Sequence, residues 1–279
     1  MEEKVGAGKV IGGIVLVLAI MIGSNIVAKA AAIALAMLPL PLDIGVVAEG
    51  VIYIACVYFL IKLLITRFFK GSLTDYNIPR FRIDLKWLLT AFLLPLAVTG
   101  IYLCLPGEFV RSDMTVWDMI NTVIMAVFFY GVSAGVVEEL VFRGVILNLL
   151  DKRFGRCAAI IIPSVLFGML HLSSDLSVLS AILVLIAGTV VGIMFSLISL
   201  AGRSVWNSAA VHAVWNIIII GGILCVGETA DSGNICSYVL SSRHFAITGG
   251  EFGVESSVIA VLGYLIVCCV AYAGMRRKN

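Results

Sequence analysis

The sequence predicts an all-α membrane protein, a polytopic bundle of about eight transmembrane helices. Of its 279 residues, 61% are hydrophobic and 13% are charged, about half the charged share of an ordinary soluble domain. The mean hydropathy is +1.12. The apolar runs are continuous rather than alternating, which indicates helices and not the strands of a barrel. This composition excludes a soluble globule, a disordered chain and a nucleic-acid-binding protein.

Each expected helix is an apolar run of the length that crosses a bilayer, roughly 20 residues. The eight runs are 10–37, 45–66, 86–105, 118–150, 157–172, 178–200, 206–226 and 256–275. The fourth is too long for one straight crossing, so we expect a kink, strong tilt or break near Gly131–Gly135. We interpret loop 227–255 as a connector in preference to a lid. Residues 1–279 then form one integral membrane domain.

The basic residues predict the orientation, because cytoplasmic loops carry the excess of Lys and Arg. Of the 19 basic residues, only Arg111 and Arg243 fall in loops outside, and Lys29 lies within the first run. Both termini are therefore predicted to be cytoplasmic. The other 16 fall inside: Lys4, Lys9, Lys62, Arg67, Lys70, Arg80, Arg82, Lys86, Arg143, Lys152, Arg153, Arg156, Arg203, Arg276, Arg277 and Lys278.

Two adjacent carboxylates, Glu138 and Glu139, interrupt the fourth apolar run. Charged groups are costly in a membrane, so they mark function or are paired. Glu139 and Arg143 are spaced i, i+4 and face each other on a helix. Glu138 points about 100° away around a helix of 3.6 residues per turn, so Arg143 cannot serve both carboxylates equally. We expect a paired, supporting Glu139 and a less compensated Glu138; a structural ion pair at a helix crossing is the alternative.

Two further polar positions stand in later apolar runs. His171 ends the fifth run, where an ordinary interfacial histidine is the alternative. His212 and Asn216 are i, i+4 in the seventh, where interhelical hydrogen bonding is the alternative. Measured from the basic residues at the inner face, Glu138, His171 and Asn216 lie about 20–22 Å deep and His212 about 14 Å. The four residues are therefore expected to meet in one layer of the bilayer.

The chemistry of this set has two interpretations. A Glu and a His can activate a water for attack on a carbonyl, and a second His and an Asn can donate hydrogen bonds to the oxyanion. Alternatively, Glu138, His171 and His212 could ligate Zn²⁺ with an open water position. The H-E-x-x-H spacing of common zinc proteases is absent. The residues alone do not choose between a metal-free and a zinc-dependent hydrolase.

Glu138-Glu139-x-x-x-Arg143, Phe167-x-x-x-His171 and His212-x-x-x-Asn216, in this order, resemble the three-motif signature of the CPBP family. These are the CAAX prenyl endopeptidases and bacteriocin-processing or immunity proteins, also called Abi. The resemblance covers roughly 115–225, the expected catalytic core. It implies an intramembrane endopeptidase in which Glu138 is the water-activating base with His171 as its partner. His212 and Asn216 would donate hydrogen bonds to the oxyanion, and Glu139 and Arg143 would support them. The resemblance favours a metal-free site over a bound metal.

The expected partners are a peptide or protein C-terminal substrate and the lipid bilayer, with no nucleic acid. The expected location is multi-pass in a membrane, the plasma membrane if the source is prokaryotic. Two other functions stay open: a non-catalytic scaffold or immunity protein on the same fold, and a transporter that uses the buried acids. The transporter is disfavoured because no pair of interrupted helices appears in matching halves.

Overall fold

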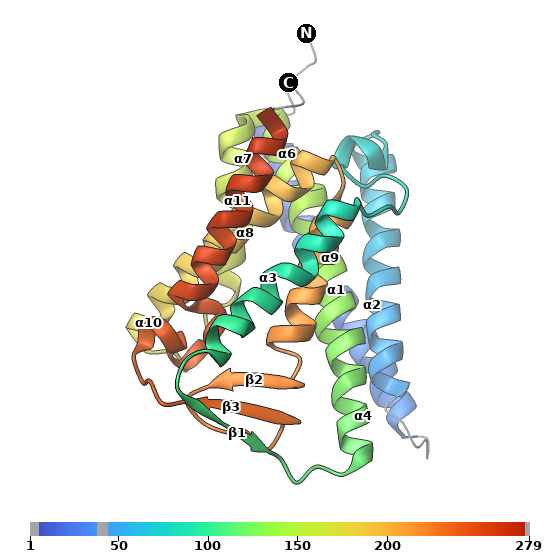
Figure 1. Cartoon of the computed structure of the whole chain (residues 1–279). Helices are drawn as coiled ribbons and strands as arrows, with labels where there is room; N and C mark the ends of the chain where they lie inside the picture. Colours follow the sequence, from blue (N-terminus) through green and yellow to red (C-terminus); the bar gives the residue numbers. More distant parts are fainter. Residues whose placement is uncertain (1–5, 38–43, 277–279) are drawn as a thin grey trace.

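The computed structural model describes residues 6–37 and 44–276, and these form a helical bundle with a small sheet at one end (Figure 1). All eight expected runs are helical. The main helices are α1 (Ala7–Ala36), α2 (Ile44–Leu63, extended by a π-helical turn, Leu64–Phe68), α3 (Leu85–Leu103), α4 to α6 within Val116–Phe154, α7 (Arg156–Leu170), α8 (Val178–Gly202), α9 (Val205–Ile219) and α11 (Val258–Arg276). A short 3-10 turn, Leu73–Tyr76, lies between α2 and α3.

Six of these helical stretches in the described ranges are long and apolar enough to cross a membrane. The other two apolar helices, α7 and α9, have 15 residues each. A crossing needs about 20 residues, so α7 and α9 are short for a crossing. They carry His171 at the end of α7 and the His212–Asn216 pair on α9. The all-α, polytopic prediction is confirmed.

The fourth run is one continuous helical stretch of 39 residues, Val116–Phe154, and not a broken one. It consists of α4 (Val116–Ile124), a π-helical segment (Met125–Ser133), α5 (Ala134–Glu139), a second π-helical segment (Leu140–Ile146) and α6 (Leu147–Phe154). The two π-helical segments flank α5, which ends on the adjacent carboxylates Glu138 and Glu139. Such π-helical insertions are frequent at functional sites.

The seventh run is helical for less of its length than expected. Helix α9 ends at Ile219, and Gly222 follows with a φ of +75°, a conformation that ends a helix and suits glycine. The chain then forms β2 (Leu224–Gly227), which lies parallel to β3 (Cys236–Leu240). Strand β1 (Gly107–Arg111) pairs antiparallel with the other side of β3, so the sheet order is β1-β3-β2.

This three-stranded sheet was not expected from the sequence, and it lies at one end of the bundle, the end that the charge pattern predicts to be outside (Figure 1). At the opposite end, Arg156 and Arg203 line one hollow together with Asp151 and Met275. Arg143, which was counted among the cytoplasmic basic residues, is instead fully buried inside the bundle because it pairs with Glu139. Lys4, Arg277 and Lys278, which the orientation also uses, lie outside the described residues.

Two close crossings set the positions of the polar helices. A Cβ on Gly135 of α5 would lie 2.9 Å from the backbone nitrogen of Ala213 on α9, and a Cβ on Gly188 of α8 would lie 2.6 Å from Cα of Gly168 on α7. Contacts this close exclude any side chain, and small residues allow such approaches in membrane bundles. The crossings bring the carboxylates of α5 to His212 and hold the end of α7 against α8.

Candidate active site

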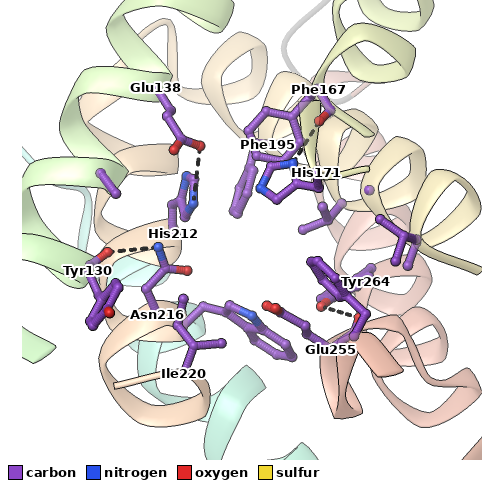
Figure 2. Close-up of a pocket in the computed structure, with 17 residues that line it drawn as sticks. Tyr130, Glu138, Phe167, His171, Phe195, His212, Asn216, Ile220, Glu255 and Tyr264 are labelled. Carbon is purple, nitrogen blue, oxygen red and sulfur yellow. Dashed lines mark hydrogen bonds and ion pairs between the residues drawn. The ribbon is translucent and has the colours of Figure 1, made fainter. Parts of the chain in front are cut away.

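The four expected site residues Glu138, His171, His212 and Asn216 line a single cavity of about 210 Å³ (Figure 2). They come from α5, the end of α7 and α9. The rest of the wall is largely apolar and aromatic, as small-ligand sites usually are. It is formed by Tyr130, Ala134, Phe167, Val184, Ala187, Gly188, Val191, Phe195, Trp215, Ile220, Phe252, Glu255 and Tyr264.

Behind the cavity wall, Glu139 and Arg143 form the expected ion pair. Arg143 Nη1 donates to Glu139 Oε1 at 2.8 Å, and Nη2 donates to the Gly192 carbonyl at 2.9 Å. Both side chains are completely buried. The guanidinium also lies 4.7 Å from the ring centre of Phe167 and 5.2 Å from that of Phe195, distances at which a cation is attracted to an aromatic face.

His212 lies between the two carboxylates. Its Nδ1 is 3.3 Å from Glu139 Oε1 and its Nε2 is 3.8 Å from Glu138 Oε2. The ring stacks on Phe195 with centroids 4.6 Å apart and planes 15° apart. A carboxylate only accepts hydrogen bonds, so Nδ1 carries the proton that it donates to Glu139. Nε2 then faces the cavity, and it donates a hydrogen bond there when the ring is an imidazolium.

Glu138 is the less compensated carboxylate, as expected. Its side chain is 28% exposed whereas that of Glu139 is 0% exposed. Its Oε2 is nevertheless enclosed and has no hydrogen-bond partner among the described residues. The 3.8 Å separation from His212 is too long for a direct hydrogen bond. A buried carboxylate oxygen without a partner is costly unless a water or a ligand completes it.

His171 lies across the cavity from Glu138 (Figure 2). Its ring is held by Nδ1, which donates to the Phe167 carbonyl at 2.8 Å. This leaves Nε2 as the free nitrogen, with a lone pair in the neutral ring. The family resemblance implied His171 as the partner of Glu138. In the described structure, however, the ring nitrogen near Glu138 belongs to His212. His171 and Glu138 share the cavity wall without a direct contact.

Asn216 is anchored by the π-helical segment. Its Nδ2 donates to the Tyr130 carbonyl at 2.8 Å, which orients the amide because a carbonyl cannot pair with Oδ1. One N–H and the Oδ1 atom remain for the cavity. The expected oxyanion role therefore depends on the single N–H that Tyr130 leaves free.

The outer segment also contributes to the cavity, which corrects its interpretation as a connector. Phe252, in the 3-10 turn Gly250–Phe252, and Glu255, in the 3-10 turn Val254–Ser256, both line the wall. Both turns follow α10 (Phe245–Thr248). Glu255 was missed because it follows a loop rich in turn residues and has no motif around it. Burial raises the pKa of its carboxyl, whereas His171, a hydrogen bond from the Trp215 side chain and His212, in that order, act in the opposite direction.

A zinc ion held by Glu138, His171 and His212 does not fit this arrangement. Within 6–37 and 44–276, no three His, Cys, Asp or Glu side chains are grouped so that they could hold a metal ion. His212 lies between two carboxylates, and His171 is across the cavity.

A second hollow lies on the outer side of the cavity. It is lined in part by Asp118, Asn121 and Asp231, and it shares Tyr130 and Ile220 with the wall of the first cavity. The two side chains therefore form a partition between the polar cavity and the hollow at the sheet-bearing end.

The comparisons with known proteins agree with this geometry. A search of the curated proteins found no match. Residues 120–218, about a third of the chain, match the family model described as type II CAAX prenyl endopeptidase Rce1-like. This segment contains all three motifs and every expected site residue. The matched family is the one that the motifs predicted, and the helical segment 120–218 of this integral membrane protein is similar to the Rce1-like type II CAAX prenyl endopeptidases.

Proposed function

We propose that this protein is an intramembrane endopeptidase that hydrolyses a peptide bond with a water activated in the Glu138 cavity. The observation that supports this most strongly is the enclosed Glu138 Oε2, which has no hydrogen-bond partner among the described residues, lies 3.8 Å from Nε2 of His212 and shares the cavity with His171. Glu139 differs because it forms a buried ion pair with Arg143 at 2.8 Å, although its own Oε2 also has no hydrogen-bond partner among the described residues. Glu138 is instead placed to accept a proton from a molecule that enters the cavity.

In the proposed reaction, a water binds in the cavity between the Glu138 carboxylate and Nε2 of His171. Glu138 accepts a proton while the water oxygen bonds to the carbonyl carbon of the peptide. The negative charge on the carbonyl oxygen receives hydrogen bonds from Nε2–H of the His212 imidazolium and from the free N–H of Asn216. The C–N bond then breaks, and the proton held by Glu138 passes to the leaving amine.

The buried network behind the wall has a supporting role in this proposal. Arg143 holds Glu139, and Glu139 holds Nδ1 of His212. This chain fixes the ring so that Nε2 faces the cavity, because the other nitrogen is already engaged. Glu139 and Arg143 are therefore positioning residues that do not touch the substrate.

The test compares wild-type protein with Glu138→Gln and His171→Ala variants, each purified in lipid nanodiscs. Each is incubated with a mixture of synthetic peptides in H₂¹⁸O, and the fragments are sequenced by mass spectrometry. We expect new fragments with ¹⁸O in the new C-terminal carboxylate from wild type and none from either variant. Cleavage by both variants at the wild-type rate would overturn the proposal.

Two further arms separate the other interpretations. The proposed mechanism predicts that 1,10-phenanthroline leaves the wild-type rate unchanged, whereas a zinc hydrolase would lose activity and regain it with added Zn²⁺. In cells, small membrane-associated peptides are compared with and without Glu138→Gln. If the variant still performs the biological role in full, the protein acts there by binding and not by catalysis.

A further inference from the structure

We propose that Glu255 selects the substrate by binding a cationic residue of the peptide, so that a Lys or Arg side chain lies near the bond that is cleaved. This inference rests on the proposed peptidase function. It adds a specificity-determining residue from the outer segment, which lies beyond the matched segment 120–218.

The charges in and around the cavity favour a cation. Its wall carries the carboxylates of Glu138 and Glu255, and the described lining residues include neither Lys nor Arg. The closest guanidinium, that of Arg143, lies behind the wall and is engaged by Glu139 and Gly192. Neither wall carboxylate therefore has a Lys or Arg side chain beside it in the cavity, and a buried charge is stable only when it is paired.

The surroundings of Glu255 also suit an alkylammonium or guanidinium group. Its carboxylate receives a side-chain hydrogen bond from Trp215 and points into the cavity (Figure 2). The rings of Trp215 and Tyr264 are 5.0 Å apart between centroids, and Phe252 lines the same wall. Aromatic faces around a carboxylate attract a cation while excluding water. The apolar wall around them accommodates the neighbouring side chains of a peptide.

The segment that carries Glu255 is fixed, as a selective site requires. Tyr264 Oη donates to the Glu255 carbonyl at 3.0 Å, and Tyr102 Oη contacts Ser257 Oγ at 2.6 Å. Ser256 Oγ donates to the Gly249 carbonyl at 2.8 Å. The serines and both tyrosines are buried. The carboxylate is therefore presented by an ordered turn and not by a loose loop.

The test measures binding, so it does not depend on cleavage. Amidated octapeptides of Leu and Ala, each with one Lys at a different position, are titrated onto the Glu138→Gln protein in nanodiscs. Matched peptides carry norleucine, which has a similar length and no charge. We expect the best Lys peptide to bind about tenfold more tightly than its norleucine partner, in line with one charge-assisted hydrogen bond. The added Glu255→Gln substitution should abolish that preference.

The control is Glu108→Gln in the same background, because Glu108 is an exposed acid on β1 at the same end of the molecule. It should keep the preference. Glu255→Gln preserves the size of the side chain, and an unchanged melting temperature verifies its fold. Equal binding of Lys and norleucine peptides, binding of neither, or a preference that survives Glu255→Gln would each overturn the inference. A wild type that cleaves without such a preference would leave the proposed peptidase intact.

Discussion

The two sides of His212 differ in how their carboxylates are paired, because only the packed side holds a buried ion pair with an arginine. On the packed side, Glu139 and Arg143 are fully buried and bonded to each other, to Nδ1 of His212 and to the Gly192 carbonyl. On the cavity side, Glu138 Oε2 has no partner in the described structure and Glu255 has no cation. Glutamate is therefore used in two ways: Glu139 fixes the His212 imidazole, and Glu138 is placed to bind a ligand.

This difference separates stability from function. Removing a satisfied buried group leaves its partner without compensation and destabilises the fold. Removing an unsatisfied group takes away chemistry and costs the fold little. Substitutions on the packed side should consequently lower the stability of the fold, whereas substitutions on the cavity side should lower the rate of cleavage.

The largest effect is expected from Glu138→Gln. Loss of a general base reduces the rate by about 10²–10⁴-fold, whereas the melting temperature should be maintained because no intramolecular hydrogen bond is lost at Oε2. Single-turnover cleavage of a peptide identified with wild type, together with thermal unfolding in nanodiscs, measures both. A strongly destabilised variant would show that Glu138 belongs to the packed side.

On the packed side, Arg143→Met should lower the free energy of unfolding by about 3–5 kcal/mol, because Glu139 then stays buried without its cation. The double variant Glu139→Gln, Arg143→Met removes both charges and should recover a good part of this loss. Denaturation in mixed micelles gives the comparison. If the double variant were no more stable than the single one, the pairing would not be the source of the loss.

A packing change between the helices tests the positioning of His171. Gly188→Val places atoms where α7 and α8 touch, and overpacking of this kind costs about 1–3 kcal/mol. We expect lower stability together with reduced cleavage, because the helix that carries His171 is displaced. Gly100→Ala serves as the control, since a Cβ there meets no atom within 4 Å, and it should be neutral.

The smallest effect is expected from Tyr264→Phe, which removes the hydrogen bond to the Glu255 carbonyl. The loss in stability should be about 1 kcal/mol. The preference for Lys peptides should weaken without loss of the cleavage rate, because Glu255 is less firmly held. The control is Tyr272→Phe on the same helix, at an exposed position, and it should change neither quantity.

The sequence predicted the packed side better than the cavity side. Eight helices followed from apolar runs, and the Glu139–Arg143 pair from i, i+4 spacing, because both depend on local periodicity. The contact of His212 with both carboxylates depends on the close approach of Gly135 to Ala213, which no local pattern encodes. Strand β1 pairs with β3 across more than 100 residues of sequence, and Glu255 reaches the cavity only through the packing of distant helices, so neither was predicted.

The partition formed by Tyr130 and Ile220 has a consequence for how much solvent reaches the cavity. A shorter residue at position 220 would widen the connection between the cavity and the second hollow, admit more solvent to the carboxylates and weaken their electrostatic contacts by raising the local dielectric. Tyr130 and Ile220 together therefore limit how far the second hollow alters the electrostatics of the cavity.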